Sequence, residues 1–234
     1  MELWTVQDAR MMDDIERDGV YRVRDANTYP YLDFGRGEDA IPEPALLISY
    51  LWMADQLRRR TGQAPPPGTR FPIWAWRRQW CRSLDAPNAG KPDMRSWTTN
   101  EPEEVVRLKL EIDESRVLLS NFDLWHIPLN RGYASLTRED DDAFDKWYAA
   151  HAPEDEFQRD IWDFSKQEPF LREARRRVFK SWELIFELEL ESVQYDSDWC
   201  GNIEDDIIQA VFWEIRSDDI VSAEHFTTRR ASRH

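Results

Sequence analysis

The chain has 234 residues and a formal net charge of −15 at pH 7. This charge disfavours a protein that grips nucleic acid over a broad surface, because phosphate neutralisation requires clustered Lys and Arg, so nucleic acid is expected only as a local substrate. Aromatic residues are abundant, with 12 Trp, 11 Phe and 7 Tyr, and they argue against disorder although 33% of the residues are charged. At this length we expect one domain with insertions.

The cysteines and the N-terminal residues indicate the cellular compartment. Cys81 and Cys200 are far apart and no Cys-x-x-Cys pair occurs, so neither a zinc knuckle nor a disulfide framework is indicated. The first residues lack the basic and apolar segments of a signal peptide, and no stretch has the apolar length of a membrane span. We therefore expect a cytoplasmic protein without a membrane partner.

The N-terminal residues follow the pattern of a strand, a short helix and a second strand. Residues 3–7 predict a short strand, and Asp8 can then cap a helix that Gly19 ends. A strand resumes at residues 20–23. This order places the helix on one face of a sheet.

Loops and regular structure alternate in the next segment. Residues 24–42 are rich in Asp, Gly, Pro and Tyr, which indicates a loop, and apolar spacing predicts a helix from Pro44 to Gly62. A strand follows at residues 71–76. Pro and Gly interrupt residues 81–102, which form an excursion, and the sequence leaves open whether it is a lid.

The middle of the chain contains the clearest strand. Apolar residues alternate with Arg107 and Lys109 over residues 106–112, which predicts a half-buried strand with one face in water. Residues 120–126 follow as a dense aromatic and polar turn.

The remaining elements are two helices and a final pair of strands. Thr137 is positioned to cap one helix, and the apolar spacing of residues 168–188 predicts a second, longer one. Residues 207–215 form an apolar run that indicates a strand buried on both faces, and residues 220–226 suggest a closing strand.

Together these elements predict a mixed α+β fold. We expect residues 1–228 to form a single domain with helical insertions, in which helices flank a central split sheet of antiparallel or mixed strands. The Arg-rich residues 229–234 are expected to be a basic disordered tail.

Standard catalytic motifs are absent from the sequence. There is no Gly-rich phosphate loop, no nucleophile elbow and no zinc-protease helix, and the four His residues are too scattered for a metal site. Acidic clusters at residues 139–142, 154–156 and 204–206 could hold Mg²⁺, but solvated first turns of helices explain them more simply. We expect no metal.

Polar side chains embedded among aromatic residues mark the candidate site. They lie at the ends of predicted strands, where they are either satisfied core groups or the lining of a cleft with aromatic walls. Asp123 and His126 are the acid and base candidates, because an Asp close to a His tunes its pKa across neutrality. The full set expected around a shared cleft is Thr5, Gln7, Trp74, Trp76, Arg77, Asp123, His126 and Gln209.

In these stretches the chain resembles a family of uncharacterised bacterial proteins, the domain-of-unknown-function family 3841. The resemblance spans nearly the whole chain, and membership implies no activity. It rests on residues 3–7 (LWTVQ), 72–76 (PIWAW), 91–93 (KPD), 118–126 (LLSNFDLWH), 180–182 (KSW) and 208–215 (IQAVFWEI).

A remoter resemblance concerns the order of the elements, which is similar to that of ADP-ribosyltransferases, especially the DarT-like group that modifies DNA. The resemblance implies a split-sheet cleft that binds NAD, with Thr5 or Gln7 contacting the ribose or nicotinamide. Gln209 stands where the family has a Glu that orients the reacting ribose. An amide cannot act as a general base or stabilise positive charge as a carboxylate does, so this departure puts catalysis in doubt. Glu214 and Glu204 are the nearby carboxylates that could substitute.

Three functions remain open from the sequence. The first is an NAD-dependent ADP-ribosyltransferase-like protein whose acceptor is unknown. The second is a catalytically degenerate module that binds a nucleotide, small-molecule or protein partner, in a bacterial stress or phage-related setting, and Gln209 favours it. The third, an acidic protein that binds a basic partner, ranks last because its acidic residues alternate with Arg.

Overall fold

The computed structural model describes residues 1–23, 45–79, 83, 85–99, 101–153, 160–188, 195–200 and 207–230. The fold is mixed α+β, as the sequence predicts, and it divides into two compact units. Unit 1 comprises Met1–Leu119 and Ile207–His234, and unit 2 comprises Ser120–Asp206. Unit 2 is thus an insertion in the sequence of unit 1. None of the helices within the described ranges combines the length and the apolar character that crossing a membrane requires.

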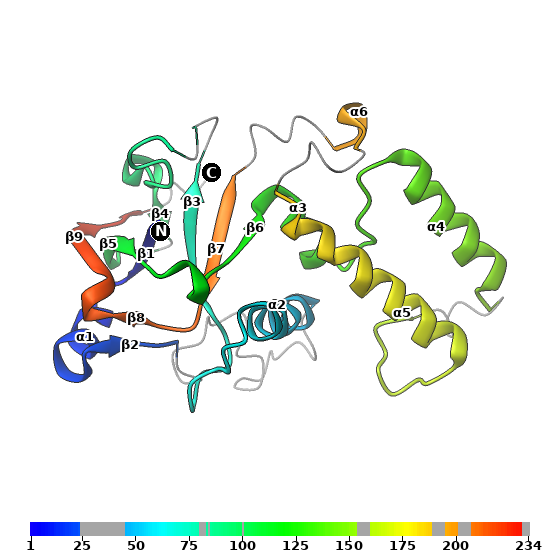
Figure 1. Ribbon diagram of the computed structural model, residues 1–234, viewed down its shortest axis with the longest axis horizontal. Coiled ribbons are helices and arrows are strands. Elements are labelled where there is room, and N and C mark those ends of the chain that lie inside the picture. The colour runs from blue at the N-terminus through cyan, green and yellow to red at the C-terminus, as the bar shows by residue number, and fades with distance from the viewer. Residues whose placement is uncertain are drawn as a thin grey trace. The chain divides into compact units, whose positions relative to one another are not determined.

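Unit 1 carries almost all of the strands, and unit 2 is helical (Figure 1). The elements of unit 1 are β1 (Glu2–Asp8), α1 (Met11–Asp18), β2 (Val20–Tyr21), α2 (Ala45–Thr61), β3 (Ile73–Arg78), β4 (Thr98–Thr99), β5 (Glu104–Glu111), β7 (Ile208–Phe212), β8 (Ile215–Arg216), β9 (Ile220–Thr227) and β10 (Arg229–Arg230). Strand β6 (Leu118–Asn121) leads into unit 2, whose helices are α3 (Phe122–Leu129), α4 (Arg138–His151), α5 (Pro169–Ser181) and α6 (Ser197–Cys200).

The main sheet has six strands in the order β6-β7-β3-β1-β5-β9. Strand β1 lies inside the sheet, antiparallel to both of its neighbours, with Trp4 opposite Trp76 of β3 and Leu3 opposite Leu110 of β5. The β3–β7 and β5–β9 pairs are also antiparallel. The N-terminal strand therefore joins segments that are distant in sequence (Figure 1).

One face of the sheet forms the hydrophobic core of unit 1, and we call it the core face. Alternate residues such as Leu3, Ile73 and Leu108 are buried there together with Met11 and Ile15 of α1. Burial of each such side chain contributes about 1.5–3 kcal/mol. The alternate apolar residues of the strands and the apolar residues of α1 thus pack together in one cluster.

The ends of the first two helices follow the predictions closely. Gly19 ends α1 in the left-handed conformation, with φ of 70°, and its N–H donates to the carbonyl of Ile15 at 2.9 Å. Gly62 follows α2 with φ of 72°. The start of α1 differs from the prediction, because Arg10 occupies the capping position and Asp8 instead accepts the Arg10 backbone N–H at 2.9 Å.

The predicted turn at residues 120–126 is wrong. Strand β6 continues to Asn121, whose side chain accepts the backbone N–H of Leu124 at 2.9 Å and so caps helix α3. Leu124 and Trp125 of this segment are buried, together with Pro128 one turn further along the helix. The cap residue and the apolar spacing both indicate a helix. The turn was predicted instead because polar residues lie among the aromatic ones.

Other boundaries are partly as predicted. Thr137 caps α4 by accepting the Asp140 N–H at 3.2 Å, and the predicted helix at 168–188 is α5 followed by a 3₁₀ segment, Trp182–Phe186. The first two residues of the predicted tail form β10, which pairs with β4. The predicted loop at 24–42 and the end of the tail lie outside the described residues.

An ion pair in unit 1 fixes the turn between β8 and β9. The Arg116 guanidinium donates to both carboxylate oxygens of Asp219, at 2.7 and 3.0 Å, and to the Glu214 carbonyl. Asp219 also accepts the Arg216 backbone N–H at 2.8 Å. Both charged side chains are almost fully buried, so loss of one leaves the other uncompensated.

We predict that Asp219→Ala lowers the free energy of unfolding by about 3 kcal/mol or more, because it strands the buried Arg116 guanidinium. Urea denaturation followed by circular dichroism measures the change. Asp218→Ala, at the exposed neighbouring position, is the control and should stay within about 0.5 kcal/mol of the wild type. Equal effects of the two substitutions would contradict the assignment.

Candidate functional site

A single row of polar and aromatic side chains crosses the face of the sheet opposite the core, which we call the outer face. Trp76 lies opposite both Gln209 of β7 and Trp4 of β1, and Trp4 lies opposite Lys109 of β5. Residues directly opposite in antiparallel strands share a face. The pairing therefore brings two of the predicted site residues, Trp76 and Gln209, together in one row.

The pleat of β1 places two other predicted residues on the core face instead. Thr5 follows Trp4, so its side chain points to the opposite side of the sheet. Its hydroxyl donates to the Trp74 carbonyl at 2.7 Å and accepts a hydrogen bond from the Gln7 amide at 2.7 Å. The Thr5 hydroxyl thus ties β1 to β3 and holds the Gln7 amide on the core face.

The two remaining predicted residues, Trp74 and Arg77, also lie on β3. Trp74 shares the outer face with Trp76, and its ring packs edge-on against Tyr50 of α2, with centroids 5.4 Å apart. Arg77 lies where the register between β3 and β7 shifts, and its side chain is half-buried.

Asp123 and His126 belong to unit 2, whereas the other predicted site residues belong to unit 1. Both are exposed on α3. The His126 Nδ1 atom lies 3.1 Å from the Phe122 carbonyl and 3.3 Å from the Asp123 carbonyl. Both of these contacts join the imidazole to the backbone of its own helix. The expected acid–base pairing of the two side chains stays a prediction.

Three cations surround the ring of Trp4 on the outer face. The Nζ atoms of Lys91 and Lys109 lie 5.0 and 5.8 Å from its centroid, and the Arg107 guanidinium carbon lies 5.9 Å away. Cations within about 6 Å of an indole face are attracted by its quadrupole. Sequence reasoning missed these residues as a site, although Lys91 lies in one of the segments that carried the family resemblance.

Two carboxylates offset the repulsion among these cations. Glu2 binds Lys109 at 2.9 Å and also accepts the Trp4 indole N–H at 3.0 Å. Glu224 of β9 binds Lys91 at 3.2 Å and Arg107 at 2.7 Å. The hydrogen bond from Arg107 holds the pKa of Glu224 below its ordinary value.

Arg107 is the unexpected residue, since the alternating pattern of β5 predicted a face in water. Only 8% of its surface is exposed. Its guanidinium donates to the Pro92 carbonyl at 2.7 Å and to Glu224, and it lies 4.9 Å from the ring centroid of Phe226. Its Nε atom is buried without a hydrogen-bond partner among the described residues. The prediction of a wet face is therefore wrong at this position.

The segment from residue 85 to residue 99 covers part of the outer face. Gly90 permits this, because a Cβ atom there would lie 2.2 Å from the Trp76 carbonyl oxygen. The Gln79 N–H donates to the Ala89 carbonyl at 2.9 Å, and the Trp97 ring meets Trp76 edge-on. The described part of the predicted excursion is thus anchored to β3.

An open groove lies between this segment and strands β5 and β9, and we call it the cationic groove. Its volume is about 600 Å³, within the range of small-molecule sites. The Arg95 side chain binds Asp93 and lowers the pKa of that carboxyl to about 2. The lining includes Asn88, Lys91, Met94, Arg95, Arg107 and Phe226.

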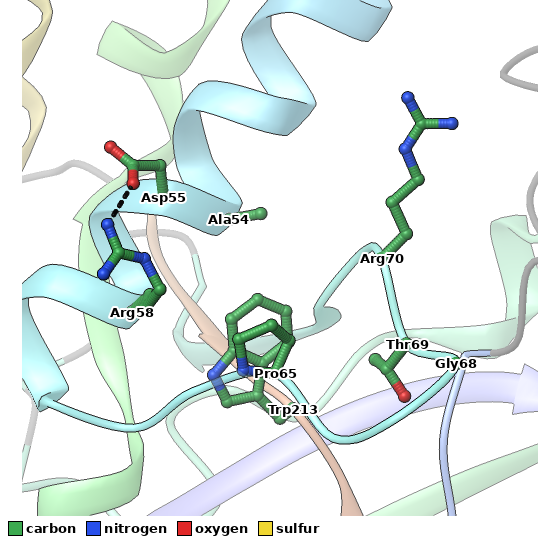
Figure 2. A pocket seen from close by; sticks show the side chains of 8 residues that line it. All are labelled: Ala54, Asp55, Arg58, Pro65, Gly68, Thr69, Arg70 and Trp213. Carbon is green, nitrogen blue, oxygen red and sulfur yellow. Dashed lines mark hydrogen bonds and ion pairs between the residues drawn. The ribbon is translucent and has the colours of Figure 1, made fainter.

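A second hollow, of about 430 Å³, lies between α2, the Pro-rich residues 65–68 that follow it, and Trp213 (Figure 2). Figure 2 shows Asp55 and Arg58 joined on one side of it and Arg70 extending on the other. The Asp55 carboxylate and the Arg58 guanidinium are 2.8 Å apart. The Trp213 indole N–H donates to the Gln63 carbonyl at 3.2 Å, which fixes the ring. This hollow has fewer convergent charges than the cationic groove, so we take the groove as the candidate site.

Among the described residues, no group of three or more His, Cys, Asp or Glu side chains is arranged so that it could hold a metal ion. Two of the three acidic clusters noted in the sequence, at 154–156 and 204–206, lie outside the described residues. The third lies in the first turn of α4.

Fold and groove thus define an α+β protein with a cationic, tryptophan-based surface on one sheet face. A family model described as Domain of unknown function (DUF3841) matches residues 2–221, and the chain belongs to this family. No curated protein and no solved structure matches the chain. The family resemblance noted in the sequence is confirmed, and the remoter likeness to ADP-ribosyltransferases is not.

We predict that Gly90→Ala destabilises the covering segment, because the added methyl group would overlap the Trp76 backbone. The free energy of unfolding should fall by about 1–3 kcal/mol, the usual cost of overpacking. Hydrogen exchange at Gln79 and Lys91 should accelerate, since both amides are bonded within this region. At the control position Gly62 an added methyl group meets open space, but φ is 72°, so Ala there strains the end of α2. This control should lower the free energy of unfolding by about 1 kcal/mol without a selective acceleration of exchange at Gln79 and Lys91.

Proposed function

We propose that unit 1 is a binding module for a phosphorylated nucleotide and that the cationic groove is its site. The observation that carries the proposal is Arg107. A guanidinium is rarely buried without need, because removing it from water costs several kcal/mol. Here it lines an open groove beside Lys91 and Arg95, which is the residue chemistry that phosphate recognition uses.

The groove has both cationic and apolar lining residues, which suit the phosphate and the base of a nucleotide respectively. Lys91 and Arg95 present donors for phosphate oxygens, and charge-assisted hydrogen bonds of this kind are the strong ones. Met94 and Phe226 supply apolar surface against which a base or ribose can pack. A net charge of −15 together with a local cationic groove favours a small ligand over a long nucleic acid, whose many phosphates the net charge would repel.

The proposal is one of binding, without a transfer step. Gln209 has only 3% of its surface exposed, and it carries an amide where the resemblance to ADP-ribosyltransferases would require a carboxylate. Burial raises the pKa of Glu214, but hydrogen bonds from Arg22 and Arg216 outweigh it, so this carboxylate is lowered in pKa and held in ion pairs. Glu204 lies outside the described residues. NAD is the first ligand to test, because the resemblance to ADP-ribosyltransferases in the order of elements implies it.

We predict that NAD and ADP bind the full chain and that Lys91→Met weakens binding about tenfold or more, since a hydrogen bond to a charged group contributes about 1.5–3 kcal/mol. Isothermal titration calorimetry at fixed salt measures both constants. Lys146→Met, on exposed α4, removes the same charge away from the groove and should bind as the wild type does. The proposal is overturned if neither nucleotide binds at millimolar concentration, or if both variants lose affinity equally.

We further predict that Gln209→Glu releases no nicotinamide from NAD. A binding module lacks other parts of a transferase site besides this carboxylate, so restoring the carboxylate alone creates no activity. Nicotinamide is quantified by chromatography after circular dichroism has confirmed the fold of the variant. Gln56→Glu, at another buried glutamine in unit 1, serves as the control. Turnover in Gln209→Glu above both the wild type and this control would contradict the proposal and favour the transferase.

A further inference from the structure

Glu224 lies beside the cationic groove and contacts two of the cations that line it. It lies directly opposite Arg107 in the pairing of β5 with β9, so both side chains share the outer face. One carboxylate oxygen lies 3.2 Å from Lys91 Nζ, and the other lies 2.7 Å from the Arg107 guanidinium. A single anion therefore bridges two of the cations that line the groove.

This bridge has the form that a bound phosphate would take. Two oxygens of one anionic group each accept from a different cation, and the remaining surface of the group faces outward, since 41% of the Glu224 side chain is exposed. A ligand phosphate and the Glu224 carboxylate would compete for the same two donors. Two anionic groups that approach the same two cations would also repel each other.

We infer that Glu224 is a resident anion, which holds Lys91 and Arg107 in the ligand-free protein and which the phosphate of the ligand displaces. This inference rests on the proposed function and adds a residue that sets the affinity of the site. Glu224 is then a negative determinant: it lowers affinity for every anion, and only a ligand with a multiply charged group and further contacts overcomes it.

The surroundings allow Glu224 to leave without collapse of the site. Arg107 keeps its hydrogen bond to the Pro92 carbonyl and its position between the rings of Trp4 and Phe226. Lys91 keeps its place over Trp4. The partly exposed carboxylate can turn into water, where its charge is solvated at little cost.

The chain offers a matched control for this inference. Glu2 is also a carboxylate on the outer face, and it also holds one of the cations around Trp4, through its 2.9 Å contact with Lys109. Neither Glu2 nor Lys109 lines the groove. Glu2→Gln therefore removes the same charge from the same face without vacating the bridge between Lys91 and Arg107.

The experiment compares the full-length wild type with Glu224→Gln, Glu2→Gln and the double variant Lys91→Met/Glu224→Gln. Calorimetric titrations use ADP and inorganic pyrophosphate as probes at one salt concentration, and thermal unfolding without ligand confirms that each variant is folded. We expect Glu224→Gln to bind both probes about tenfold more tightly, and Glu2→Gln to change affinity less than about twofold. The double variant should lose the gain, because the vacated position needs both cations.

The outcomes separate this inference from the proposed function. If the wild type binds and Glu224→Gln binds equally or more weakly, the inference is overturned and the proposed function stands. Equal gains in Glu224→Gln and Glu2→Gln would also overturn it, because general charge would then explain both. If neither the wild type nor Glu224→Gln binds either probe, both the proposed function and the inference fail.

Discussion

The outer face of the sheet is organised by one buried guanidinium. Arg107 extends from a strand whose neighbours Val106 and Leu108 fill the core, so its own side chain must end on the other face. There it needs hydrogen-bond acceptors and flat surfaces, because an uncompensated buried charge is costly. The Pro92 carbonyl, the Glu224 carboxylate and two aromatic rings supply them. These contacts draw the covering segment and the edge strand β9 to the same place, and the cationic groove lies where they meet.

The local elements could be predicted because their signals are local. Glycines at the ends of α1 and α2 adopt the left-handed conformation that only glycine takes without strain. The alternation in β5 identified a strand and the side of it that faces the core. The capping hydroxyl of Thr137 placed the start of α4. In each case a few neighbouring residues contain the whole physical reason for the structure.

The site could not be predicted in the same way, since its contacts join distant segments. A two-residue period tells which side chains share a face, but not whether that face is later covered, and so Arg107 was expected in water. The expected cleft treated Thr5 and Gln7 as companions of Gln209, whereas the pleat and the pairing through Trp4 and Trp76 place them on opposite faces. The groove also depends on Gly90, whose closeness to Trp76 appears only in the folded chain.

The central claim is that a nucleotide occupies the cationic groove, and the methionines allow a direct test. Met94 lines the groove, while Met11 and Met53 are buried elsewhere in unit 1. In an NMR titration of protein labelled with ¹³C at the methionine methyl groups, ADP should shift the Met94 resonance progressively and leave those of Met11 and Met53 in place. A saturable shift at Met11 or Met53 with Met94 unmoved, or no shift at all, would contradict the account.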